Sequence, residues 1–110
     1  MKLTNEFESI REWADHKGLY SKGDVRTQML KLTEEVGELS KAILTGDKRE
    51  FIDAIGDCCV VLTSLAELGN EYFNPIDKIT IEQCINSAYN VISKRTGKME
   101  NGTFVKDPSQ

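Results

Sequence analysis

The sequence has few of the residues that break helices or cross-link chains. Only two of its 110 residues are proline, Pro75 and Pro108, so most of the chain is free to be helical. The three cysteines, Cys58, Cys59 and Cys84, are an odd number without metal-ligand spacing, which gives no support for a disulfide framework or a zinc site. They lie in apolar runs, so we expect buried small side chains in a reducing compartment.

Long apolar runs and net positive charge are also missing. No run approaches the roughly 20 apolar residues of a membrane span, and the opening MKLTNEFESIREW is too charged for a signal peptide. The net charge of −4 and the pI near 5.0 argue against binding of duplex nucleic acid, which requires a basic face. We therefore expect a cytoplasmic protein with no membrane and no duplex nucleic-acid partner.

The length indicates one domain, residues 1–99, followed by a C-terminal turn and arm, residues 100–110. With 39% hydrophobic residues, a domain of this size buries a modest core, so we expect self-association as a homodimer or homotetramer. The dipeptide Asn101-Gly102, flanked by Met99 and Phe104, predicts a tight turn with a short extended arm.

Helical periodicity dominates the rest of the chain. The predicted fold is all-α, an antiparallel four-helix bundle-like arrangement, with the stretch 18–23 as a loop. The CCVVL stretch is apolar on every side, which places it centrally in the bundle or in a subunit interface. The fourth helix is expected to bury Ile81, Cys84, Ile85, Ala88 and Ile92. The four helices are predicted over about Asn5–Lys17, Asp24–Thr45, Asp47–Gly69 and Thr80–Gly97.

Acidic pairs stand on the two central helices. Glu35 and Glu38 are about 60° apart on the helical wheel, on one flank of the apolar stripe. Asp53 and Asp57 are one turn apart on the next helix, and Asp57 borders the all-apolar stretch. A carboxylate there is costly unless a cation compensates it, and Mg²⁺ prefers oxygen ligands. The pattern thus indicates a metal site between two helices.

The same acids have a second interpretation, in which they bind no metal. They can lie on solvated helix faces, with Lys31 and Glu35 forming an ordinary surface pair. Gly37 and Gly56, each next to an acid, cost about 1 kcal/mol in a helix and favour close approach of two helices or of a ligand.

These residues carry a resemblance to a known family. The stretch LKLTEEVGELSKAI followed by DAIGDCCVVL resembles the MazG-like all-α nucleoside triphosphate pyrophosphatases, whose signature is ExxE followed by ExxD on the next helix. REWADHKGL and AYNVISKRTGKMENGTFVKD resemble the short single-domain members of bacteria and phages. Glu35 and Glu38 match ExxE, and Asp57 matches the end of ExxD. Ala54 stands at the first position of ExxD, a departure that leaves Asp53 as the candidate replacement ligand.

The resemblance implies hydrolysis of nucleoside triphosphates to a monophosphate and pyrophosphate. Mg²⁺, or Mn²⁺, is expected on Glu35, Glu38, Asp53 and Asp57, with the first two and Asp57 as the catalytic carboxylates. The ion would bind the triphosphate, and water would attack it. Loss of the acid at Ala54 is expected to weaken ion binding and activity.

Substrate contacts are predicted from basic and aromatic residues. Asn90, Lys94 and Arg95 of the fourth helix, and Lys31 of the second, are candidates for the phosphates. Cations near a helix end also have a simple dipole explanation, which applies to Arg95. Trp13 is a candidate for stacking on the base, with burial in the core as the alternative.

Gln28, on the same flank as Glu35, is a candidate to read the edge of the base. The sequence does not determine base or sugar preference. Three further readings stay open: a nucleotide-binding or regulatory protein that has lost turnover through Ala54, a structural helical dimer, and a phosphoribosyl-ATP pyrophosphohydrolase, whose acid-rich signature is missing.

Overall fold

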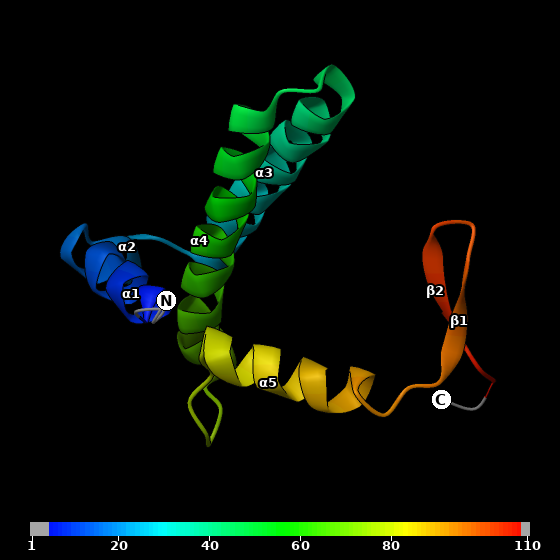
Figure 1. Cartoon of the computed structure of the whole chain (residues 1–110). Coiled ribbons are helices and arrows are strands. Elements are labelled where there is room, and N and C mark those ends of the chain that lie inside the picture. Colours follow the sequence, from blue (N-terminus) through cyan, green and yellow to red (C-terminus); the bar gives the residue numbers. More distant parts are fainter. Residues whose placement is uncertain (1–4, 109–110) are drawn as a thin grey trace.

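The computed structural model describes residues 5–108, which are mostly helical and end in a β-hairpin (Figure 1). The all-α prediction with a short extended arm is confirmed. The predicted loop 18–23 is wrong in part, because it contains the one-turn helix α2. The elements are α1 (Glu6–His16), α2 (Leu19–Lys22), α3 (Val25–Thr45), α4 (Lys48–Phe73), α5 (Ile81–Ile92), β1 (Gly97–Glu100) and β2 (Thr103–Lys106).

Helices α3 and α4 form a long antiparallel pair (Figure 1). Asp24 starts α3 as the predicted N-cap, its side chain accepting a hydrogen bond from the backbone of Thr27. The chain reverses at Gly46, whose φ of 69° lies in the left-handed region that glycine adopts without strain. Ala42 and Ala54 are buried, and such small side chains let the two helices run close together.

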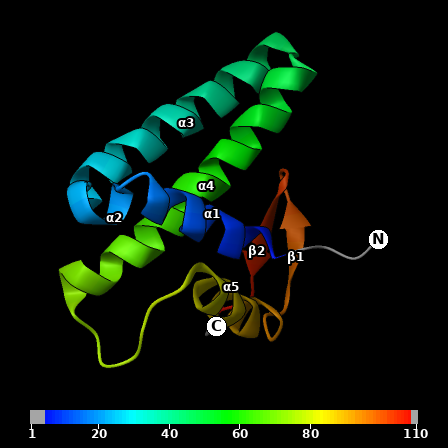
Figure 2. The ribbon, with the colours of Figure 1, turned by 90° about the vertical axis from the view of Figure 1, so that its left-hand side faces the viewer.

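Helices α1 and α2 pack on α4, with α1 crossing it at an angle (Figure 2). Ala14 of α1 is fully buried, as are Thr63 and Ser64 of α4. The Thr63 hydroxyl donates a 2.7 Å hydrogen bond to the carbonyl of Cys59, which satisfies it inside the helix. The core therefore lies along α4, where α1 and α3 meet it.

Helix α4 runs one turn beyond its predicted end at Gly69. It ends at Asn74, whose left-handed φ of 47° precedes Pro75. The Asn70 amide holds the following connector, donating to the Ile79 carbonyl at 2.8 Å and accepting from the Ile79 N–H at 2.6 Å. The connector thus packs beside Gly69, and the helix continues past this residue.

Helix α5 extends from the end of α4 as an arm (Figure 1). Thr80 is its N-cap, as predicted, but the helix ends at Ile92, before the predicted Thr96-Gly97. The side expected to be buried is exposed within the chain at Cys84, Ile85, Ala88 and Ile92, while Ile81 is half-buried. Burial of this face was predicted from its periodicity, and no other described element covers it.

The hairpin of β1 and β2 turns at Asn101 and Gly102, with φ values of 50° and 82°. This confirms the tight turn, since Asn-Gly suits two consecutive left-handed residues. Met99 pairs with Phe104 across the strands, and all eight strand residues are exposed. The division into residues 1–99 and 100–110 stays a prediction.

Several apolar features expected to be buried are not covered within one chain. Cys58 is half-buried, Cys59 is exposed, and Leu62 of the CCVVL stretch is also exposed. Among residues 5–108, no atom beyond each glycine's own local backbone would meet a Cβ added at Gly37 or Gly56, so close helix packing within this part of the chain does not explain these glycines. No helix of residues 5–108 is long and apolar enough to cross a membrane.

Candidate metal and nucleotide site

Three carboxylates converge in the middle of the α3 and α4 pair. Glu35 and Glu38 come from α3 and Asp57 from α4, and one oxygen of each lies within 4.8 Å of the others. The spacing on α3 places its two acids on one flank, and the antiparallel packing brings Asp57 opposite them. The structure thus brings together the three acids that matched the family pattern.

Glu35 is the buried member of this cluster, with only 4% of its surface exposed. Its Oε1 lies 3.2 Å from the Nζ of Lys31, one turn earlier on α3. Its Oε2 is also buried and accepts no hydrogen bond from the described part of the chain. A buried, unpartnered carboxylate oxygen is costly, and a cation is the partner that offsets this cost best.

The three acids of the cluster carry like charges, which repel one another. The charge of Glu35 raises the pKa of Glu38, and burial, followed by the charges of Glu35 and Asp53, raises the pKa of Asp57. A raised carboxyl pKa means that the ionised form is disfavoured in the folded protein. A divalent cation between these oxygens would reverse this, because it stabilises the ionised form.

The donor set fits a hard divalent ion. All three ligand groups offer carboxylate oxygens, which Mg²⁺ and Mn²⁺ accept, and two of the three residues face solvent, where water and phosphate can complete the coordination. Glu35, Glu38 and Asp57 are the residues that would hold such an ion.

Asp53 and Ala54 occupy different surroundings. Asp53 is exposed and does not belong to the carboxylate cluster of the described residues, although its charge acts on Asp57. Its role as a direct ligand stays a prediction. Ala54 is 3% exposed, so the position where the family pattern has an acid points into the packed helix pair.

A cavity of about 700 Å³ adjoins this cluster, with walls from α1, α2, α3 and α4. It contains Lys31, which also pairs with Glu35, and it contains Trp13 and Gln28, the two candidates for base contacts. Trp13 is 55% exposed, so the core alternative for this residue is wrong. The remaining walls are Leu19, Thr27, Leu30, Thr33, Glu34, Val60, Val61 and Ser64.

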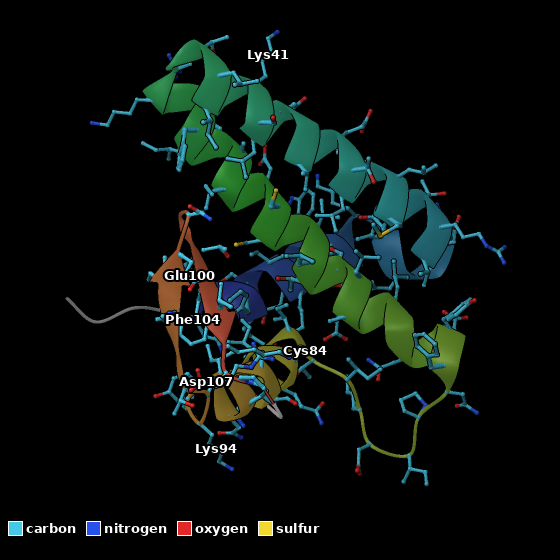
Figure 3. All side chains as sticks on the ribbon, turned by 90° about the vertical axis from the view of Figure 1, so that its right-hand side faces the viewer. Lys41, Cys84, Lys94, Glu100, Phe104 and Asp107 are labelled. Carbon is cyan, nitrogen blue, oxygen red and sulfur yellow. The ribbon has the colours of Figure 1, made fainter. Side chains whose placement is uncertain are left out.

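The phosphate candidates of α5 lie elsewhere in the chain. Asn90, Lys94 and Arg95 line a separate cavity of about 710 Å³, formed by α5 and the residues just after it. Lys94 follows α5 and lies away from the α3 and α4 pair (Figure 3). Within one chain, the structure therefore groups Lys31, Trp13 and Gln28 beside the carboxylates and leaves the α5 residues apart.

Sequence reasoning missed the part of this cavity that belongs to α4. Val60, Val61 and Ser64 follow Asp57 by three, four and seven residues, the spacing of one helix face. That spacing could have identified these residues, because the face of α4 that begins at Asp57 continues along the cavity.

Comparisons with known proteins give the family of the chain. A stretch of 65 residues is 34% identical to the "Uncharacterized 18.2 kDa protein in rep-hol intergenic region" of Haemophilus phage HP1 (strain HP1c1), covering 59% of this chain and 40% of that protein. The chain thus spans less than half the length of this relative. No solved structure matches the chain. Residues 24–99, from the N-cap of α3 into β1, match the MazG nucleotide pyrophosphohydrolase domain, and the chain belongs to this family.

Proposed function

We propose that this protein hydrolyses nucleoside triphosphates, canonical or modified, to nucleoside monophosphate and pyrophosphate, with Mg²⁺ or Mn²⁺ held by Glu35, Glu38 and Asp57. The observation that carries the proposal is the buried Oε2 of Glu35, which lacks a hydrogen-bond partner among residues 5–108 and belongs to a cluster of three acids. Membership of the MazG family supports the reaction class.

The bound ion would neutralise phosphate charge, orient the triphosphate and lower the pKa of the attacking water. Lys31 keeps Glu35 in place through the 3.2 Å ion pair. Glu38 is the solvent-facing acid of α3 in the cluster, and an ionised carboxylate can accept a proton as a general base. We propose that its carboxylate oxygen accepts the proton that is released as water attacks the α-phosphorus.

The site is proposed to be completed by a second copy of the chain in a homodimer or homotetramer. A triphosphate carries about four negative charges, whereas Lys31 is already paired with Glu34 and Glu35. Asn90, Lys94 and Arg95 of another copy would supply further polar and positive groups. The exposed apolar side chains of α4 and α5 support association, because a monomer seldom leaves such surfaces uncovered. They include Ile52, Ile55, Leu62, Ile85 and Ile92.

A second candidate function is nucleotide binding without turnover. It is favoured by Ala54, which supplies no carboxylate where the family pattern has one. Such a protein would bind nucleotide with the ion and serve a regulatory role. We favour hydrolysis because three of the four pattern acids converge. We place either activity in the cytoplasm, where nucleoside triphosphates are abundant.

A pyrophosphate-release assay over canonical and modified nucleotides, with Mg²⁺ and Mn²⁺ in turn, tests the proposal. We expect metal-dependent release that falls at least ~100-fold in Glu38→Ala. Glu71→Ala is the control, since Glu71 is an exposed acid of α4 outside both the carboxylate cluster and the adjoining cavity. Calorimetric binding of nucleotide with no release from any of them would establish the second candidate instead.

A further inference from the structure

We infer that a different cavity, of about 390 Å³ between α1, α2, α4 and the connector to α5, binds a linear aliphatic diamine or polyamine. Its ammonium groups would be held by Glu67, by Tyr20 and by acids on one face of α1. Glu35, Glu38 and Asp57 do not line this cavity, so the inference is independent of the proposed hydrolysis.

A buried carboxylate without a hydrogen bond lines this cavity. The Glu67 side chain is 11% exposed, and its Oε1 is buried and accepts no hydrogen bond from residues 5–108. Its ion pairs are long, 3.9 Å from Oε1 to the Nε of Arg11 and 3.7 Å from Oε2 to the Nζ of Lys78, and neither distance allows a hydrogen bond. Such a carboxylate is costly, and a cation with N–H donors would offset the cost.

The Tyr20 hydroxyl is a second buried polar group of the cavity. It forms no hydrogen bond of ordinary geometry with the described residues, although Ser64 is close enough to influence its pKa. Burial, followed by the charge of Glu67, raises the pKa of Tyr20, and the charge of Asp15 adds to this effect. Tyr20, Glu67 and Asp15 thus offer neighbouring oxygen acceptors, which suit the three N–H donors of one primary ammonium group.

The lining of the cavity has more acids than bases. Arg11 is already bound, because it donates to both oxygens of Glu82 at 2.6 and 2.7 Å and to Glu8 at 2.7 Å. Glu12 and Asp15 are exposed and form no ion pair with residues 5–108, so they remain available to a cation. The four acids and two bases, a net charge of −2, are Glu8, Glu12, Asp15, Glu67, Arg11 and Lys78.

The spacing of these acids favours an elongated cation over a metal ion. Among the described residues, three acids converge within 4.8 Å in the cluster of α3 and α4, and the acids of this cavity do not converge in that way. Glu12 and Asp15 are about 4.5 Å apart along the axis of α1, and Glu67 belongs to another helix. A volume of about 390 Å³ also has room for a short aliphatic chain. A methylene chain with an ammonium group at each end matches this distribution of charge.

Calorimetry with putrescine and spermidine tests the inference on the whole chain, in metal-free buffer of low ionic strength. We expect saturable binding of one molecule per chain and a Tm that rises with ligand concentration. Butylamine, which has a single ammonium group, should bind at least ~10-fold more weakly, and K⁺ should give no saturable heat. Equal binding of butylamine or K⁺, or no saturable binding of either polyamine, would overturn the inference.

Variants of the lining residues locate the site. Glu67→Gln keeps the size of the side chain without its charge and should weaken putrescine binding at least ~10-fold. Asp15→Asn, at an exposed position where folding is not at risk, should weaken it to a smaller extent. Glu71→Gln removes the same charge from an exposed position of α4, one turn beyond Glu67 and outside the cavity, so it is the matched control. Unchanged binding in the two cavity variants, or equal weakening by Glu71→Gln, would overturn the inference.

Amide NMR spectra separate this cavity from the carboxylate cluster of α3 and α4, the other acidic site for a polyamine. Putrescine should shift the signals of Asp15, Tyr20 and Glu67 and leave those of Glu38 and Asp57 little changed. Shifts confined to Glu38, Asp57 and their neighbours would assign the ligand to the carboxylate cluster and overturn the inference. None of these measurements needs catalysis, so a failure of the proposed hydrolysis would leave them unaffected.

Discussion

The α3 and α4 pair and the α5 arm differ in how their functional residues are held. The pair brings Glu35, Glu38 and Asp57 within 4.8 Å through contacts inside the chain. The arm, α5, has no fully buried residue, and Lys94 and Arg95 follow its last helical turn, before an exposed hairpin. The proposed metal end of the site is therefore set by one chain, whereas placing the basic residues over a substrate would require something outside it.

Two contacts fix the start of the arm. Arg11 of α1 donates to both carboxylate oxygens of Glu82, at 2.6 and 2.7 Å, and Asn70 holds the backbone of Ile79. Beyond this anchor, α5 has few contacts with the other helices (Figure 1). The direction of the arm is thus defined where α5 begins, and the proposed second copy would cover the rest of its length.

The largest effect expected is from complementation between copies. Lys94→Ala and Glu38→Gln should each lower pyrophosphate release by at least ~100-fold, one through the phosphates and one through the ion. A mixture of the two variants, unfolded and refolded together, should regain part of the activity if α5 of one copy serves the acids of another. Full activity of Lys94→Ala alone would show that the arm is dispensable.

The next effect concerns the missing acid at position 54. Ala54→Glu should raise activity with Mg²⁺ by about tenfold through an added ligand. Without divalent ions it should lower Tm, because a fourth carboxylate enters a position that is 3% exposed. Ala54→Gln has the same size without the charge, so it should lower Tm without a gain in rate. Equal rates for both variants would indicate that no ligand is missing there.

Arg11→Ala removes the contact that anchors the start of α5. The Arg11 side chain is 14% exposed and holds Glu82 by two short bonds, so its loss should reduce the free energy of unfolding by about 1–2 kcal/mol. We expect a Tm several degrees lower and faster amide exchange in α5 than in α3. Arg49→Ala, an exposed arginine at the start of α4, is the control. Uniform exchange across all helices would argue against a local anchor.

The same contact predicts a pH dependence. The two hydrogen bonds from Arg11 lower the pKa of Glu82 from its ordinary 4.5 to about 2. The unfolded state therefore binds the proton first, so this stabilisation is complete above pH 4.5 and is lost as pH falls from 4.5 toward 2. We would measure the free energy of unfolding in urea for the native chain and for Arg11→Ala across this interval. The difference between the two should shrink as pH falls. A difference that is constant with pH would contradict the assignment.

The smallest effect is expected at Gly37. An added Cβ meets no atom of residues 5–108, and alanine is favoured over glycine inside a helix by about 1 kcal/mol. Gly37→Ala should therefore raise Tm slightly if this face of α3 stays in solvent. A lower Tm together with a smaller species in size-exclusion chromatography would show instead that a second copy packs against this face.

The acids were predictable because local rules determine them. A separation of three positions on one helix sets the angle between Glu35 and Glu38. The family pattern indicated Asp57 on the antiparallel neighbour. The cavity residue Ser64 follows the same helical face, but its role depends on α1 crossing α4, which no local pattern fixes. Helix α2 was missed because Gly18 and Gly23 read as loop, although four residues between them form a turn of helix.

Exposure was the least predictable property. Cys59, Cys84 and Ile85 were assigned to buried faces from apolar periodicity, yet they are exposed in the single chain. Periodicity identifies a face that is suited to burial, and it does not say whether the covering surface belongs to the same chain. The proposed oligomer would reconcile the pattern with the structure.

The most direct test of the account is the identity of the bond that is cut. We would follow a nucleoside triphosphate by ³¹P NMR with the native protein, with Mg²⁺ and then with EDTA. The account predicts monophosphate and pyrophosphate in equal amounts with Mg²⁺ and no change with EDTA. Formation of diphosphate and orthophosphate, or cleavage that persists in EDTA, would contradict a metal-dependent pyrophosphohydrolase built on Glu35, Glu38 and Asp57.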